Sequence, residues 1–279
     1  MTGTIRTLTP AEAQRAVDWA AAEGWNPGLA DLDAFLAQDP GLFLGAFAGE
    51  DLLAVIAATR YEPAFGFIGF YIARPEARGQ GHGMAVWRAG MARLSGRVVG
   101  LDGVVAQQAN YRKSGFALAW NNIRYGGEAP VLPTPRAAIV PAATIHFAAL
   151  EALDRQVFPT PRPDFLRHWI AAPGHVALVL LRDGAPAGYG VIRPCRSGHK
   201  IGPLTAPDEG GAEALLAALL ERADPGPIFL DLPQPNAAAV RLAERIGLKP
   251  VFETARMYAG PAPALPMERL FGVTSFELG

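Results

Sequence analysis

Residues 71–94 read YIARPEARGQGHGMAVWRAGMARL, and an apolar segment, FGFIGFYIA at residues 65–73, leads into them. The apolar run is typical of a buried strand, and the residues after position 83 have a helical pattern. Between the two, Arg78, Gly81 and Gly83 form an R-x-x-G-x-G arrangement. Glycines let the backbone approach a ligand closely, and the first turn of a helix exposes unpaired N–H groups at its positive end. The segment therefore predicts a loop that holds a phosphate group.

Other interpretations of this loop exist. A glycine-rich turn without a ligand fits the same spacing. A dinucleotide-binding Rossmann loop is disfavoured, because the glycines do not fall as G-x-G-x-x-G and because an antiparallel hairpin, not the start of the chain, precedes them. A Walker-type phosphate loop is excluded, since the Gly-Lys-Ser/Thr ending is missing.

The composition predicts a folded, globular protein. The chain has 279 residues, of which 50% are hydrophobic and 18% are charged, with a formal net charge of −1. This length favours two domains over one. The scattered basic residues offer no footprint for nucleic acid. No segment is long and apolar enough to serve as a signal peptide or membrane span, so we expect a cytoplasmic protein with no membrane partner.

Cysteine and histidine usage gives no sign of a metal centre. The single Cys195 lies in a predicted strand, where a buried apolar thiol is expected rather than a reactive one. The five histidines show no ligand spacing with one another or with Cys195. We therefore expect no metal.

The two halves of the chain repeat one order of predicted elements at an offset near 130 residues. Each half has a strand, a helix, an antiparallel hairpin (residues 42–61 and 176–195), a third strand, a helix, a fourth strand, and a helix that ends in a Gly-hydrophobic step, Gly115-Phe116 or Gly247-Leu248. A proline-rich connector separates them. We therefore predict a duplicated α/β fold with a mixed sheet, divided into a domain at 1–127, a linker at 128–143 and a domain at 144–279.

The first half resembles the GNAT superfamily of acetyl-CoA-dependent N-acetyltransferases, whose phosphate loop has the motif [RQ]-x-x-G-x-[GA]. Arg78, Gly81 and Gly83 match that motif, and Ala73-Arg74-Pro75 has the form of the family's preceding V-x-P element. The resemblance implies a fold of this family, acetyl-CoA as cosubstrate, pairing of β-strand backbone groups with the pantetheine arm, and a pyrophosphate held by loop amides. The implied cofactor-binding residues are Tyr71, Ile72, Ala73, Arg78, Gly79, Gln80, Gly81, His82, Gly83 and Met84.

A second match, Tyr111-x-x-x-Gly115-Phe116, is similar to the family's Y-x-x-x-G-F ending of a helix. The resemblance assigns Tyr111 as the general acid that protonates the departing thiolate. A phenol suits that role, because it stays protonated at neutral pH. The alternative is a tyrosine that packs against the sheet with its hydroxyl group on the backbone.

The general base and the acceptor site are less defined. The strand before the loop contains no carboxylate, although many family enzymes have a glutamate there, so Glu23, Glu62 and Asp102 remain equal candidates. In the resembling fold, the segment after the first helix covers the acceptor pocket, which makes Glu23, Trp25 and Asn26 candidate substrate contacts. The same residues would serve equally as a helix stop with one packed aromatic side chain.

The second half lacks both motifs. Pro207, Asp208 and Glu209 stand where the phosphate loop would be, and acidic side chains repel a pyrophosphate. The position of the general acid is held by Ala243. The whole chain resembles a subgroup of two-domain GNAT proteins with a C-terminal acetyltransferase-like domain, so the second half is interpreted as a degenerate repeat that shapes the acceptor pocket or the interface.

Two functions follow as hypotheses. The first is an N-acetyltransferase in which a small-molecule primary amine attacks the thioester directly in a ternary complex. The second is a module of the same fold that binds CoA or another nucleotide without turnover, which the missing strand carboxylate favours. Neither the acceptor, the physiological acyl group nor the oligomeric state follows from the sequence.

Overall fold

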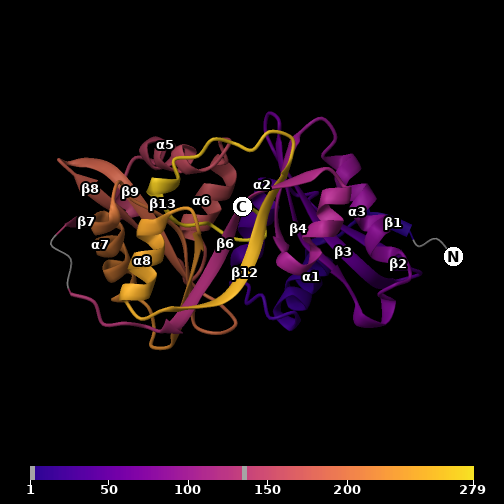
Figure 1. The fold of residues 1–279 in the computed structure, drawn as a ribbon, viewed down its shortest axis with the longest axis horizontal. Coiled ribbons are helices and arrows are strands. Elements are labelled where there is room, and N and C mark those ends of the chain that lie inside the picture. The colour runs from indigo at the N-terminus through magenta and orange to yellow at the C-terminus, as the bar shows by residue number, and fades with distance from the viewer. Residues whose placement is uncertain (1–3, 134–136) are drawn as a thin grey trace.

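A computed structural model describes residues 4–133 and 137–279 (Figure 1). Part of the predicted linker, residues 134–136, therefore lies outside the described residues. The elements of the first half are β1 (Thr4–Thr7), α1 (Pro10–Ala22), α2 (Asp31–Gln38), β2 (Phe43–Ala48), β3 (Asp51–Tyr61), β4 (Phe65–Ala73), α3 (His82–Arg93), β5 (Val98–Val104), α4 (Gln108–Lys113) and β6 (Phe116–Glu128). The second half consists of β7 (Ala138–Pro141), α5 (Phe147–Val157), α6 (Pro163–Ala171), β8 (Val176–Arg182), β9 (Ala185–Pro194), β10 (His199–Thr205), α7 (Glu209–Leu220), β11 (Pro227–Pro233), α8 (Ala237–Arg245), β12 (Lys249–Ala259) and β13 (Leu270–Gly272). The duplicated α/β order is confirmed.

Local sequence explains where the first helix begins. Thr9 accepts a hydrogen bond from the amide of Glu12, while the Glu12 carboxylate accepts one from the amide of Thr9 at 2.9 Å. This reciprocal capping satisfies two amides that the helix leaves unpaired, and Pro10 stands at the first helical position, where its missing N–H costs nothing. The helix buries its alanine face against β4 and thereby fixes the loop at residues 23–28.

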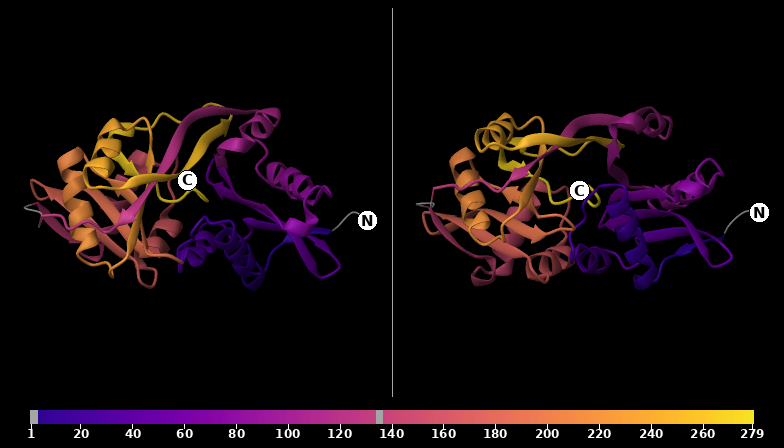
Figure 2. Two further views of the ribbon diagram at one scale, coloured as in Figure 1. Left: turned by 60° about the horizontal axis from the view of Figure 1, so that its bottom comes forward. Right: turned by 90° about the horizontal axis from the view of Figure 1, so that it is seen from below.

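All strands form one sheet in which the halves exchange their last strands. The order is β1-β2-β3-β4-β5-β12-β6-β11-β10-β9-β8-β7, and β13 pairs with β10. β12 of the second half lies between β5 and β6, and β6 of the first half lies between β12 and β11. Figure 2 shows β6 and β12 arching from one half to the other. Each half is therefore completed by a strand that comes from the other half.

Two equivalent buried ion pairs hold the exchanged strands. Arg256 on β12 donates Nε to Asp102 on β5 at 2.8 Å and Nη2 to the same carboxylate at 2.6 Å. Arg124 on β6 repeats this two-point contact with Asp231 on β11, at 2.6 and 2.8 Å. These four side chains are at most 6% exposed. Because each arginine reaches across a strand exchange, the pairs tie one half to the other.

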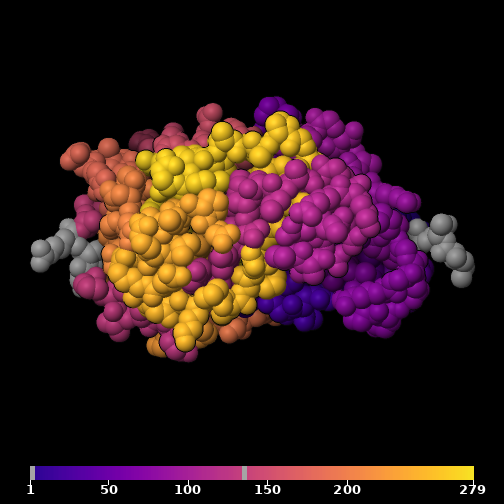
Figure 3. Space-filling view, viewed as in Figure 1, coloured from indigo at the N-terminus to yellow at the C-terminus, as the bar shows by residue number. Residues whose placement is uncertain are grey.

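Helices cover both faces of the sheet. On one face, α1 and α2 of the first half share a core with α5 and α6 of the second half, in which Phe35 stacks on Phe165 and Trp169. On the other face, α3 covers the first half and α7 and α8 cover the second. Figure 3 shows second-half residues in yellow directly against first-half residues in magenta. No described helix is both long and apolar enough to cross a membrane.

Candidate active site

A cavity of about 440 Å³ lies where β4 and β5 separate. The two strands pair in parallel only from Phe65↔Val98 to Ile68↔Leu101. Beyond that point a bulge in β4 sets Phe70 and Tyr71 opposite one residue of β3, and the backbone of Phe70 takes a left-handed φ of 46°. The strands therefore open into a wedge (the first wedge) that side chains of both halves line.

The predicted phosphate loop lies at the rim of the first wedge. Gly79 and Gly81 have φ values of 77° and 88°, which L-residues with a side chain rarely adopt, so glycine suits both positions. α3 begins at His82, no side chain caps it, and the amides of its first turn are left without intrahelical partners. Exposed amides at the positive end of a helix fit a pyrophosphate, so this structure has a suitable place for one.

The ten predicted cofactor-binding residues divide into two groups by position. Tyr71, Ile72, Ala73, Arg78 and Gly83 line the cavity. Gly79, Gln80, Gly81, His82 and Met84 lie beside it in the loop and the first turn of α3.

Arg78 connects the loop to the opposite rim. Its Nε donates to the carbonyl of Ala73 at 3.1 Å, and its Nη2 forms an ion pair with Glu23, which follows α1. The Arg78 side chain is 52% exposed, so its guanidinium remains accessible to a phosphate group.

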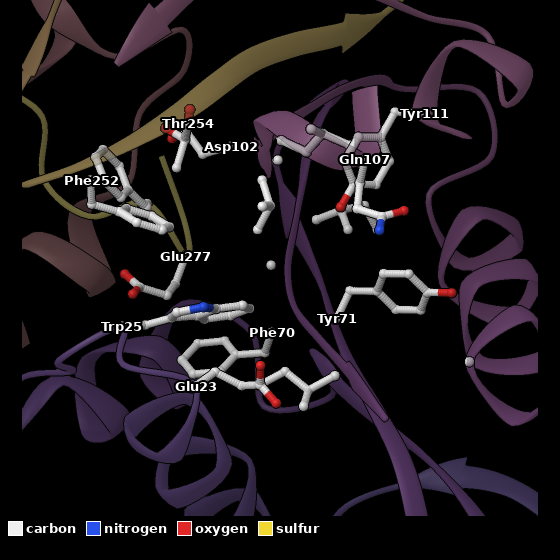
Figure 4. A pocket seen from close by; sticks show the side chains of 18 of the residues that line it. Glu23, Trp25, Phe70, Tyr71, Asp102, Gln107, Tyr111, Phe252, Thr254 and Glu277 are labelled. Carbon is white, nitrogen blue, oxygen red and sulfur yellow. The ribbon is translucent and has the colours of Figure 1, made fainter. Parts of the chain in front are cut away.

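Tyr111 of α4 lies over β5, inside the cavity (Figure 4). Gly103 permits this position, because a Cβ there would stand 2.3 Å from the tyrosine ring. Trp87 of α3 supports the ring at a centroid distance of 5.6 Å. Burial raises the pKa of Tyr111 to about 12, so the hydroxyl group is protonated at neutral pH. Within residues 4–133 and 137–279 no protein group forms a hydrogen bond with it, which leaves its proton available to a ligand.

The three candidate bases lie in different environments. Glu62 forms an ion pair with Arg97 and does not line the cavity. Glu23 lines the rim but is paired with Arg78. Asp102 lines the cavity, yet its carboxylate accepts three hydrogen bonds, two from Arg256 and one from Asn122 at 2.8 Å. Burial raises the pKa of Asp102, and Arg256 opposes part of that effect.

The acceptor-side candidates also differ in position. Trp25 lines the cavity, and its backbone carbonyl accepts a hydrogen bond from Arg124 at 2.8 Å. Asn26 points elsewhere: its side chain donates to the carbonyl of Ser197 and accepts from the amide of the same residue, at 3.0 and 2.9 Å. Asn26 thus joins the two halves and is not among the cavity's lining residues.

The sequence analysis expected the second half to shape the acceptor pocket or the interface, but it named none of the second-half residues that line this cavity. Phe252, Thr254, Phe276 and Glu277 line it, as does Arg124 of the exchanged strand β6. Figure 4 shows Trp25, Phe252 and Glu277 on one side and Tyr71 and Tyr111 on the other. No local motif marks these residues, because only the strand exchange and the path of the C-terminal segment bring them here. A search for a carboxylate outside the first half would have included Glu277.

The equivalent wedge of the second half, between β10 and β11 (the second wedge), is filled. These strands pair in parallel from His199↔Ile228 to Ile201↔Leu230, and β13 then enters between them. β13 pairs with β10 at Leu204↔Gly272, and the next residue, Val273, donates its amide to the carbonyl of Asp231 on β11 at 2.7 Å. The chain itself thus occupies the place that is open in the first half.

Family models match both halves. The acetyltransferase (GNAT) family model matches residues 10–116, and a second acetyltransferase (GNAT) domain model matches residues 150–272. The chain is a tandem member of the GNAT superfamily. It is accordingly an acyltransferase.

Individual relatives agree with this assignment over the full chain. Holothin acyltransferase from Pseudoalteromonas sp. (strain SANK 73390) is 26% identical, over 100% of this chain and 95% of the relative. A putative acetyltransferase from Pyrococcus horikoshii has a TM-score of 0.86 at 20% identity, covering 100% and 96% of the two chains. A tandem GNAT protein from the clavulanic acid biosynthesis pathway has a TM-score of 0.64 at 14% identity, covering 93% and 99%. The two structural likenesses establish the fold.

Proposed function

We propose that this acyltransferase transfers an acetyl group from acetyl-CoA to a primary amine of a small molecule, in one direct step within a ternary complex. The observation that carries the proposal is the first wedge, which has a glycine loop and an uncapped helix start at its rim and the protonated Tyr111 inside it. A full-length relative named as an acyltransferase supports the reaction type.

Each group of the chain has a defined task in this reaction. The loop amides and Arg78 bind the pyrophosphate, and the backbone of β4 at residues 71–73 holds the pantetheine arm against the sheet. Tyr111 donates its proton to the sulfur as the C–S bond breaks, which avoids release of a free thiolate. The apolar walls exclude water and so limit hydrolysis of the thioester.

Two measurements test the proposal. Calorimetric titration should give a single site per chain for acetyl-CoA and for CoA, and none for NADH. Tyr111→Phe should lower the turnover number by about 10²-fold while the affinity for acetyl-CoA stays unchanged. Tyr125→Phe is the matched control, since the Tyr125 hydroxyl group donates a hydrogen bond to Glu244 outside the cavity.

The outcomes separate enzyme from sensor. If acetyl-CoA binds but no amine causes release of the CoA thiol, the protein is a binding module instead. An unchanged turnover number in Tyr111→Phe would remove the tyrosine from the general-acid role.

A further inference from the structure

Glu277 has a carboxylate in the cavity that receives no hydrogen bond or ion pair from the described part of the chain. It lies on the C-terminal segment, is 5% exposed and lines the first wedge. Of the hydrogen bonds and ion pairs among the described residues, none involves its side chain, in contrast to the carboxylates of Glu23 and Asp102. The Glu277 oxygens are not among the fully buried side-chain atoms that lack a partner, so they open onto the cavity. A ligand in the cavity can therefore donate a hydrogen bond to them.

The surroundings of Glu277 define what such a ligand looks like. Trp25, Phe252 and Phe276 form an aromatic wall beside it. The guanidinium of Arg124, which also lines the cavity, lies 5.1 Å from the ring centre of Phe276 and 5.8 Å from that of Phe252 and donates hydrogen bonds to Asp231 and to the Trp25 carbonyl. These contacts fix the position of the aromatic wall.

The charged groups near Glu277 disfavour a ligand with several positive charges. Arg124 is neutralised by Asp231, and the buried Lys200 lies on the same side as Glu277, with one contact of 3.5 Å to the Trp25 carbonyl. Burial lowers the pKa of Lys200, and Glu277 acts in the opposite direction. A ligand with several positive charges would leave all but one of them without a partner in this cavity.

We propose that Glu277, with Trp25, Phe252 and Phe276, forms the acceptor subsite, which receives the single ammonium group of a compact amine with a flat, apolar body. This inference rests on the proposed function. Glu277 accepts one proton from the ammonium group, which frees the lone pair that attacks the thioester carbon. As the N–C bond forms and the C–S bond breaks, the sulfur takes a proton from Tyr111. The nitrogen then loses its second proton, which restores the tyrosine, and the proton on Glu277 passes to solvent.

The position of the subsite agrees with this order of events. Trp25, Phe252 and Glu277 lie opposite Tyr71 and Tyr111 in Figure 4, so an amine held by Glu277 faces the thioester from the side away from the cofactor loop. The backbone of the C-terminal segment is fixed there as well, because the carbonyl of Glu277 packs on Gly69 of β4, where a Cβ would stand only 2.0 Å from it.

The test compares benzylamine, an ammonium ion at neutral pH, with aniline, which is neutral there. Glu277→Gln should lower kcat/KM for benzylamine by at least about tenfold and should change that for aniline much less, because aniline has no proton to give up before attack. In the variant, kcat/KM for benzylamine should rise with pH as free amine forms. Spermidine, with several charges, should be a poor acceptor of the wild type. Glu253→Gln, an exposed change on β12, is the matched control.

Each outcome decides something. An equal loss for both amines, or no loss, would overturn the role of Glu277. If the wild type binds acetyl-CoA but neither binds nor acetylates benzylamine, the acceptor subsite is wrong while the proposed function stands. If acetyl-CoA itself does not bind, the proposed function fails first.

Discussion

The two wedges of this molecule have the same arrangement of strands, but the first is open and the second is filled. In each half two parallel strands pair over a few residues and then separate, next to a buried aspartate that an arginine of the exchanged strand holds. The first wedge continues into a cavity of about 440 Å³, and the second is closed by β13. The helix starts differ too: Gly81 precedes α3 without a side-chain cap, whereas Asp208 caps α7. Duplication thus preserved the scaffold and left one site open.

The same C-terminal segment produces both results. It first pairs with β10 as β13 and then continues to the first half, where Phe276 and Glu277 line the open cavity. The second half therefore lines the first wedge in two ways, through β12 and through this segment. That it shapes the acceptor pocket or the interface stays a prediction.

The largest expected effect comes from breaking one of the two ion pairs that hold the exchanged strands. Arg124→Met leaves Asp231 buried and unpaired, and Arg256→Met leaves Asp102 buried with only the hydrogen bond from Asn122, so each should lower the free energy of unfolding by about 3–5 kcal/mol. Because the sheet is continuous, urea unfolding followed by circular dichroism should remain one transition. Arg182→Met, which breaks an exposed pair with Asp208, should cost less than about 1 kcal/mol. Equal costs for all three would contradict the importance of burial.

The second largest effect is expected from charge reversal at the predicted phosphate loop, which compares the two wedges in their effect on acetyl-CoA affinity. Arg78→Glu should weaken acetyl-CoA binding by about 100-fold, since it removes a charged donor to the pyrophosphate and adds a repelling carboxylate. Arg182→Glu, close to the start of α7, should leave the affinity unchanged, because β13 fills the second wedge and we expect no cofactor there. Calorimetry measures both. If both variants lost a similar amount of acetyl-CoA affinity, cofactor binding could not be assigned to the first wedge alone.

Local pattern was sufficient for much of the fold. β4 (Phe65–Ala73) has the bounds of the apolar run, and the periodicity of Ala13, Val17 and Ala20 predicts a helix from about Pro10 to Ala22, as α1 has. The helix expected from Gly83 begins one residue earlier, at His82. Cys195 is buried, as expected for an apolar thiol, and burial raises its pKa. α2 and α6 were not predicted, because each follows a proline- or glycine-containing loop and spans only two to three turns.

The pairing of strands between the two halves could not be predicted from the sequence. The predicted order of elements ends at Gly115-Phe116 and Gly247-Leu248, just where β6 and β12 begin, and local pattern does not name the neighbours of such strands, since either could pair within its own half. The exchange became visible only in the register of Asp102 with Arg256 and of Asp231 with Arg124. For the same reason the carboxylate search stopped at Glu23, Glu62 and Asp102 and did not reach Glu277.

The smallest expected effect concerns the start of α7 and separates two features that we expect to keep a cofactor out of the second wedge, namely β13 and Asp208. Asp208 accepts a hydrogen bond from the amide of Gly211 at 2.8 Å, so Asp208→Ala should lower the free energy of unfolding by about 1 kcal/mol, while Asp224→Ala, in an exposed loop, should not change it. If β13 alone closes the wedge, calorimetry of Asp208→Ala should still give one acetyl-CoA site per chain. A second site would mean that the aspartate, and not the strand, keeps the cofactor out, and that the C-terminal segment can leave its place between β10 and β11.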